Sequence, residues 1–358
     1  FDGALLMEGT GNGTEKFNSG LLLNRGTVSA NGTGSVTLEG RGSTDGTDKG
    51  NSGIEANQAT IQANAGTITL EGTGGEGTRD NFGIELSRTT LTGTGAVSLI
   101  GDADQDTTEK SNVGVALSRT NLTGASLNIE GTGGGGSNDN LGVDVSYGTL
   151  TASGGLLSID GSANPTTTGK GNSGLAISRA ILLGSQDITL IGDGGEGTHN
   201  NRGIELSRTT VTGAGAVSLT GDADRDTTGK SNAGILISRS DVRGASLSLM
   251  GDGGGGTRDN IGVSVANSSS LSATGGNLTI DGTARNLTAT DQKNHGVSII
   301  RNVTITATGS LGITGNGGGG EQSHGVFMNS NITAPGANVM GTAGPGADSE
   351  DTFGDFFP

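Results

Sequence analysis

The sequence predicts an all-β protein, a right-handed parallel β-helix of about eleven three-stranded rungs of roughly 30 residues each. Three observations predict this fold. A tripeptide recurs at nearly regular spacing, aliphatic and polar residues alternate after each copy, and the composition is rich in glycine and poor in aromatic residues. The chain has 358 residues, 72 of them glycine, and only 2% are aromatic. Several large compact cores are therefore not expected.

The recurring tripeptide is Asn-x-Gly, and successive copies lie 28 to 34 residues apart. Its glycine falls at Gly20, Gly53, Gly83, Gly114, Gly142, Gly174, Gly203, Gly234, Gly262 and Gly296. An eleventh copy, Ser323-His324-Gly325, has serine in place of asparagine. Each copy is expected to open one rung of the solenoid.

Three short strands are expected in each rung, as the rung that opens at Gly83 illustrates. Aliphatic residues alternate with polar ones after this glycine, which indicates strands with one buried face. The inward side chains of this rung are expected to be Ile84, Leu86, Leu91, Val97 and Leu99. A polar loop over residues 102–111 then leads to the next tripeptide. We expect a right-handed coil, because the connections between parallel strands of one sheet are almost always right-handed.

The sequence also repeats with a period that is longer than one rung. Residues 83–145 match residues 203–265 at an offset of 120, with 42 identities in 63 positions. A single rung buries too little apolar surface to offset the entropy of ordering its chain. Rungs are therefore expected to fold only as a stack, in which each is stabilised by its neighbours.

The tripeptide itself suggests a mechanical role. Glycine allows the chain to turn with a positive φ, or to pass close to the rung below. Stacked asparagine amides can hydrogen-bond along a column. We expect such a structural ladder at Asn51, Asn81, Asn112, Asn140, Asn172, Asn201, Asn232, Asn260 and Asn294.

Charge and residue types exclude several functions. The net charge of −16 disfavours nucleic acid as a partner. Cysteine is absent, which excludes disulfides and thiolate sites. No apolar run approaches the ~20 residues of a membrane span. The outward acids Glu85, Asp144 and Glu205 are rungs apart, and the histidines (His199, His295 and His324) fall in loops or turns and not on one face. We therefore expect neither catalysis nor a cofactor.

Two acidic loops resemble calcium-binding loops, because hard oxygen ligands occupy alternate positions. These weak candidates are Asp102, Asp104, Asp106, Asp222, Asp224 and Asp226. The first loop departs from the EF-hand pattern, with Thr107 at the glycine position and Val113 at the glutamate position. Solvated loops are expected, with neither a metal site nor a ladder of acids from rung to rung.

Arginine recurs five residues after the glycine of the tripeptide. The column consists of Arg25, Arg88, Arg119, Arg179, Arg208, Arg239 and Arg301. One interpretation is a solvated corner whose side-chain stems cover apolar surface. The other is an interaction edge, which would face the acidic loops of an adjacent rod.

The ends differ from the middle of the chain. Residues 1–340 are expected to form a single solenoid, and residues 341–358 an acidic tail. This tail carries Phe353, Phe356 and Phe357, and is either a linker or a hydrophobic docking segment. Leu5 and Met7 begin a partial rung, so we expect open ends that associate with further copies of the chain.

Residues 201–221 resemble the repeats of filamentous-haemagglutinin-like surface proteins, which are frequent in giant secreted proteins of cyanobacteria and other Gram-negative bacteria, and they are also similar to autotransporter passengers. The resemblance covers about residues 4–340. It implies secretion, an extracellular or cell-surface location, and a role in adhesion, surface layers or filaments. The leading hypothesis is a structural rod that acts by self-assembly. The alternatives are a receptor- or glycan-binding adhesin, and a polysaccharide-processing β-helix such as a phage tailspike.

Overall fold

The structure is a computed structural model that describes residues 3–46, 48–103, 110–164, 169–223, 229–285 and 293–345. These residues form strands grouped in three parallel sheets. They contain no helix, so no described segment could cross a membrane in helical form.

Sheet A has twelve strands, each the last strand of its rung. They are β1 (Leu5–Thr10), β4 (Val36–Arg41), β7 (Ile68–Thr73), β10 (Val97–Asp102), β13 (Leu127–Thr132), β16 (Leu157–Ser162), β19 (Ile188–Asp193), β22 (Val217–Asp222), β25 (Leu247–Asp252), β28 (Leu278–Thr283), β31 (Leu311–Asn316) and β34 (Asn338–Thr342).

Sheet B has eleven strands, each of which begins at the middle residue of a tripeptide or directly after its glycine. They are β2 (Leu21–Asn24), β5 (Ile54–Asn57), β8 (Phe82–Ser87), β11 (Val113–Ser118), β14 (Leu141–Ser146), β17 (Ser173–Ser178), β20 (Arg202–Ser207), β23 (Ala233–Ser238), β26 (Ile261–Ala266), β29 (His295–Ile300) and β32 (Val326–Met328).

Sheet C has eleven short strands that lie between the other two in each rung. They are β3 (Thr27–Ala30), β6 (Thr60–Ala63), β9 (Thr90–Gly93), β12 (Asn121–Gly124), β15 (Thr149–Ala152), β18 (Ile181–Gly184), β21 (Thr210–Gly213), β24 (Asp241–Gly244), β27 (Ser270–Ala273), β30 (Thr304–Ala307) and β33 (Asn331–Thr333).

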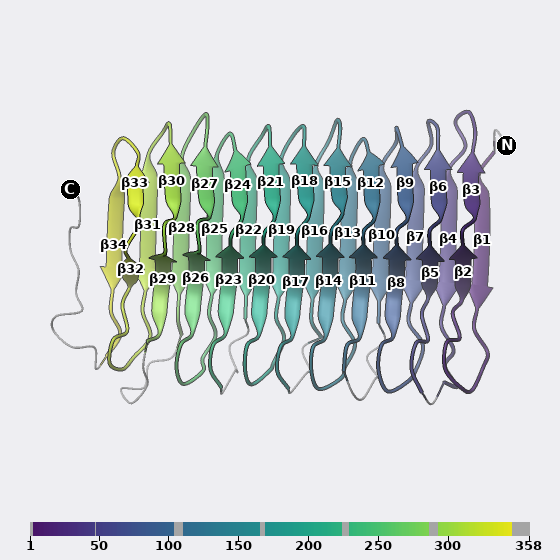
Figure 1. The fold of residues 1–358 in the computed structure, drawn as a ribbon, viewed down its shortest axis with the longest axis horizontal. Coiled ribbons are helices and arrows are strands. Elements are labelled where there is room, and N and C mark those ends of the chain that lie inside the picture. Colours follow the sequence, from purple (N-terminus) through teal and green to yellow (C-terminus); the bar gives the residue numbers. More distant parts are fainter. Residues whose placement is uncertain are drawn as a thin grey trace.

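Every strand from β1 to β31 pairs in parallel with the strand three places further along the chain, so equivalent residues of successive rungs lie side by side. In sheet A, for example, Leu99 of β10 pairs with Leu70 of β7 and with Ile129 of β13. Figure 1 shows the three sheets running along the whole length of a straight rod. At ~4.8 Å per rung, eleven rungs make a rod roughly 50 Å long. The predicted parallel β-helix is confirmed.

The core is one continuous column of aliphatic side chains inside the coil. All five inward residues predicted for the rung of Gly83 are buried, and one cluster extends from Val28 to Ile313. At the two ends, residues such as Leu5, Met7 and Val339 pack against this cluster but are only partly buried.

Glycine of the tripeptide closes the corner between sheets A and B. A Cβ on Gly83 would lie 2.3 Å from the backbone nitrogen of Asp102, and a Cβ on Gly101 would lie 2.1 Å from the carbonyl oxygen of Gly114. Two glycine columns therefore let the two sheets touch through their backbones. The close approach is mainly to the facing sheet and not only to the rung below, and the alternative prediction of a positive φ is wrong for Gly83 and Gly114.

The residue before each tripeptide makes the left-handed turn instead. Its φ lies between 53° and 75° in all eleven rungs. These residues are Phe17, Gly50, Asp80, Ser111, Asp139, Gly171, Asn200, Ser231, Asp259, Lys293 and Gln322. Six of them are glycine, asparagine or aspartate, the types that tolerate this conformation best.

The solenoid extends slightly past the boundary expected at residue 340, because β34 ends at Thr342. Phe353, Phe356 and Phe357 lie outside the described residues.

Replacing Leu206 with Asp should unfold the rod or lower its stability by several kcal/mol, because Leu206 is fully buried and the change places an unpaired charge in the core. The control is Ser207→Asp, on the outer face of the same strand, which should cost about 1 kcal/mol or less. Urea unfolding followed by circular dichroism measures both. Equal midpoints for the two variants would contradict the inside and outside assignment.

Candidate functional site

An unbroken hydrogen-bonded ladder runs along the asparagine column. In each step, the Oδ1 of one asparagine accepts a hydrogen bond from the backbone N–H of the asparagine one rung earlier. The donor–acceptor distance is 3.0 Å from Asn51 to Asn81, 3.1 Å from Asn172 to Asn201 and 2.9 Å from Asn201 to Asn232. The nine predicted asparagines are all fully buried.

The ladder is longer than predicted at both ends. The backbone N–H of Asn18 donates to Oδ1 of Asn51 at 3.2 Å, and the N–H of Asn294 donates to the hydroxyl of Ser323 at 3.1 Å. Serine therefore replaces the acceptor of the missing asparagine. The side-chain Nδ2 atoms of Asn172 and Asn232 find no partner among the described residues. The oxygen is thus the atom that each rung requires.

A second, shorter ladder of hydroxyl groups was missed in the sequence. Backbone N–H groups at this corner donate to hydroxyls of the next rung, at 3.0 Å from Thr209 to Ser240 and 3.2 Å from Ser240 to Ser269. Its signal was the threonine or serine that directly follows several of the corner arginines. Ala59 and Ala180 interrupt the column in other rungs, so it contributes to some rungs only.

The arginine column forms the corner between sheets B and C. Ten consecutive rungs place a residue with φ between 50° and 66° at this corner, and in the last two of them the following residue, Ser268 or Asn302, also has a positive φ. We call these ten the arginine edge: Arg25, Gln58, Arg88, Arg119, Tyr147, Arg179, Arg208, Arg239, Asn267 and Arg301. The seven arginines are all exposed. Left-handed backbone costs an ordinary residue about 1–2 kcal/mol, so arginine is not chosen here for the turn itself.

The three other residues of the edge each contact a neighbouring arginine. Arg25 donates from Nε to Oε1 of Gln58 at 3.1 Å, and Arg301 donates to Oδ1 of Asn267 at 3.3 Å. Tyr147 lies between two guanidinium groups, 5.5 Å and 5.0 Å from its ring centre. None of the seven arginines forms an ion pair with a carboxylate in the described part of the chain.

Carboxylates also gather on the outer face of sheet B. Glu55 and Glu85 are direct neighbours in the register, a pair that the sequence reasoning missed. Burial, and then the charges of Glu55 and Asp80, raise the pKa of Glu85 from 4.5 to about 7. Burial alone raises the pKa of Asp144 to about 6. Glu205 is paired with Arg202 at 2.7 Å.

Two of the three histidines lie together, which corrects the expectation that they share no face. The rings of His295, His324 and Phe327 stack with centroids 5.2 to 5.3 Å apart. The backbone N–H of His324 donates to Nδ1 of His295 at 3.2 Å. Burial, then the charges of His324 and Lys293, lower the pKa of His295 to about 4. The His295 ring is therefore neutral near neutral pH, and the three stacked rings pack over the last rungs of sheet B.

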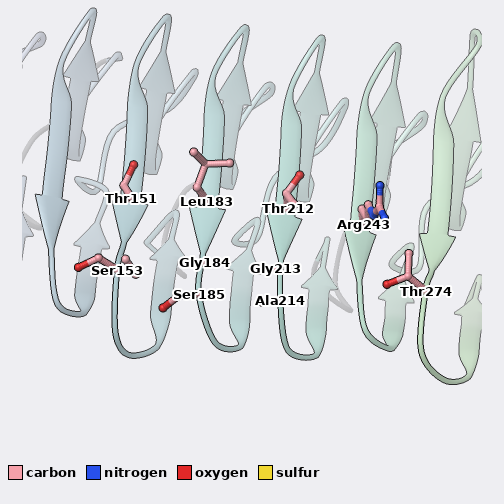
Figure 2. A pocket seen from close by; sticks show the side chains of 11 residues that line it. Thr151, Ser153, Leu183, Gly184, Ser185, Thr212, Gly213, Ala214, Arg243 and Thr274 are labelled. Carbon is pink, nitrogen blue, oxygen red and sulfur yellow. The ribbon is translucent and has the colours of Figure 1, made fainter.

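A shallow hollow lies along the end of sheet C. Figure 2 shows its lining: hydroxyl groups such as Thr151 and Thr212, the aliphatic Leu183, and one cation, Arg243. Its lining has no carboxylate or histidine. The lining of the hollow therefore holds no acid–base pair. The neighbouring carboxylates Glu55 and Glu85 lie on sheet B and not on sheet C.

Only two of the six calcium-loop candidates lie in the described part of the chain. Asp102 and Asp222 end β10 and β22, whereas Asp104, Asp106, Asp224 and Asp226 lie outside the described residues. No group of three potential metal ligands occurs where the structure is described.

The expectation of no acid ladder from rung to rung was wrong. Ten consecutive strands of sheet A, from β1 to β28, each carry one carboxylate on their outer face, at the fourth or the sixth position of the strand. We call this set the acidic row: Glu8, Glu39, Glu71, Asp102, Glu130, Asp160, Asp193, Asp222, Asp252 and Asp281. Arg285 forms ion pairs with Asp252 and, at 4.0 Å, with Asp222.

No protein-family model, curated protein or solved structure matches this chain.

Stability should fall as the pH rises through Glu85's titration. The folded state holds this proton more tightly than the unfolded state, so stability is fully present below pH 4.5 and is lost as the pH rises through about 7. The side chain of the Glu85→Gln variant stays neutral at every pH. The free energy of unfolding of this variant, relative to that of the wild type, should therefore rise by up to about 3 kcal/mol between pH 5 and pH 8. Urea unfolding at both pH values measures this gain. The control is Glu196→Gln, an exposed loop position; a gain of the same size there would contradict the assignment.

Proposed function

We propose that the chain is a secreted or cell-surface structural rod, a component of a filament or layer or a segment of a giant adhesin, that acts by self-assembly and not by catalysis. One observation carries the proposal: the core and the asparagine ladder continue through the rungs without a break. A solenoid built this way is a stiff spacer, because each rung is held by the rungs on both sides.

The chemistry of the surface supports a non-catalytic role. The hollow on sheet C lacks an acid–base pair, and the neighbouring carboxylates Glu55 and Glu85 lie on a different face. Acid–base catalysis needs both groups within reach of one bound substrate. Two lines on the outer surface instead keep one sign of charge over many rungs, arginine at the corner between sheets B and C and carboxylates on sheet A, which suits contacts with another repetitive surface.

We also propose that rods associate end to end. Among the described residues, the terminal strands of sheet A, β1 and β34, each pair along one edge only. Leu5 and Met7 are only partly buried there. A further rung would cover these side chains and pair the edge, whether another copy or a longer parent chain supplies it.

Mass measured by light scattering across concentration tests this association, with negative-stain microscopy to show filaments. The double variant Leu5→Lys/Met7→Lys puts two charges into the end layer and should shift the protein to monomers. Leu6→Lys is the matched control, because Leu6 lies on the outer face of the same strand and is 56% exposed. A wild-type protein that stays monomeric at every concentration would contradict self-assembly through the ends.

A further inference from the structure

The arginine edge is chosen for its side chains and not for its backbone. The molecule has two left-handed columns, which serve as controls for each other. The column before the tripeptides contains no arginine and is dominated by small and polar residues. The edge has the same backbone conformation, yet arginine occupies seven of its ten positions. A residue type that the turn disfavours is therefore retained for a contact made outside this rod.

The immediate surroundings of the edge leave its charges available. Six consecutive serines flank it on sheet B, and mostly threonine, serine and asparagine flank it on sheet C. The serines are Ser87, Ser118, Ser146, Ser178, Ser207 and Ser238. Asp241 is the single carboxylate among the residues that begin the sheet C strands from β3 to β30.

The acidic row keeps one charge in each rung even where the position changes. Where the fourth residue of a strand is acidic, the sixth is neutral or, once, arginine. Where the fourth residue is uncharged, the sixth is aspartate. The internal duplication shows the exchange: Glu130 and Thr132 correspond, 120 residues later, to Met250 and Asp252. A carboxylate per rung is therefore maintained over ten rungs, although no single column holds it.

We propose that the arginine edge of one rod docks on the acidic row of a second copy of this chain. Both arrays span ten rungs and both repeat at the strand spacing of ~4.8 Å, so a shift by whole rungs still brings the arginines of the edge opposite carboxylates of the row, except at Gln58, Tyr147 and Asn267. A second copy is the partner whose spacing this fold guarantees. The proposal rests on the rod function proposed above and names the surfaces that join rods sideways.

The geometry of the contact predicts a layer of rods. The edge lies between sheets B and C, whereas the row lies on sheet A, so the two surfaces differ and the contact is heterologous. Each docked rod keeps one unused edge and one unused row. Such a contact does not close on itself and adds rods side by side. Each exposed pair contributes little, and the contact depends on their number and weakens with salt.

Paired charge reversals test the proposal. The edge variant is Arg179→Glu/Arg208→Glu/Arg239→Glu, and the row variant is Glu71→Lys/Glu130→Lys/Asp160→Lys. Each variant alone should need at least tenfold more protein for lateral association than the wild type. An equimolar mixture should associate again, because each variant's altered surface then meets its complement. Light scattering measures association, and microscopy distinguishes side-by-side rafts from single-file filaments.

Controls separate this contact from folding and from end-to-end assembly. Arg79→Glu/Arg243→Glu/Arg258→Glu makes the same charge change off the edge and should associate like the wild type. The variant Arg179→Asn/Arg208→Asn/Arg239→Asn suits the left-handed backbone, so it should abolish rafts while the melting temperature stays unchanged or rises. Single-file filaments should survive in every edge or row variant, whereas failure of the rod function itself would remove them too.

Three results would overturn the proposal. The first is wild-type protein that forms no rafts at about 0.1 M salt, where the screening length is about 10 Å. The second is a mixture of the two folded variants that stays unassociated. The third is tight binding of dextran sulfate to the edge with no lateral association of the protein alone, which would assign the edge to a polyanion. Rafts that dissolve as salt approaches about 1 M would support the contact.

Discussion

The structure depends on one repeated hydrogen bond, from the backbone N–H of one asparagine to the side-chain oxygen of the asparagine in the next rung. A buried backbone donor without a partner costs about 1–3 kcal/mol, so each rung requires its neighbour to present an oxygen at this point. The bond fixes where every rung begins. With the start fixed, the strands that follow lie in register, although the loops between rungs differ in length and composition.

Register then determines the surface as well as the core. Inward positions of successive rungs form a single aliphatic column, and the two glycine columns let sheets A and B meet at one corner. On the outside, the same register turns scattered residues into lines: the arginine edge between sheets B and C, and the acidic row on sheet A. A side chain that is unremarkable in one rung becomes part of an extended charged surface, because its equivalents lie one strand spacing apart.

Much of this fold is predictable from the sequence, because alternation is a local property. Ile84 and Leu86 face inward for the same reason in every rung, and the asparagine column follows from its recurrence. The role of Gly83 was not predictable, since Asp102, whose backbone it approaches, follows it in the chain by 19 residues and folds back against it. The left-handed turn at Asp80 was missed because that column mixes residue types.

Features that need register across rungs were also missed. Glu55 and Glu85 are 30 residues apart in the sequence and become neighbours only through strand pairing. The acidic row escaped notice because its charge alternates between two positions, as between Glu130 and Asp102, so neither column is acidic throughout. His295 and His324 stack for the same reason, from two different rungs.

The most direct test of the account is a comparison of Asn201→Ala with Asn31→Ala, an exposed asparagine outside the ladder. Asn201 accepts the backbone N–H of Asn172 at 3.1 Å. Its loss should lower the free energy of unfolding by about 1–3 kcal/mol and speed hydrogen exchange at the amide of Asn172. Equal unfolding free energies for the two variants, with unchanged protection of the Asn172 amide, would contradict the claim that this ladder holds the rungs in register.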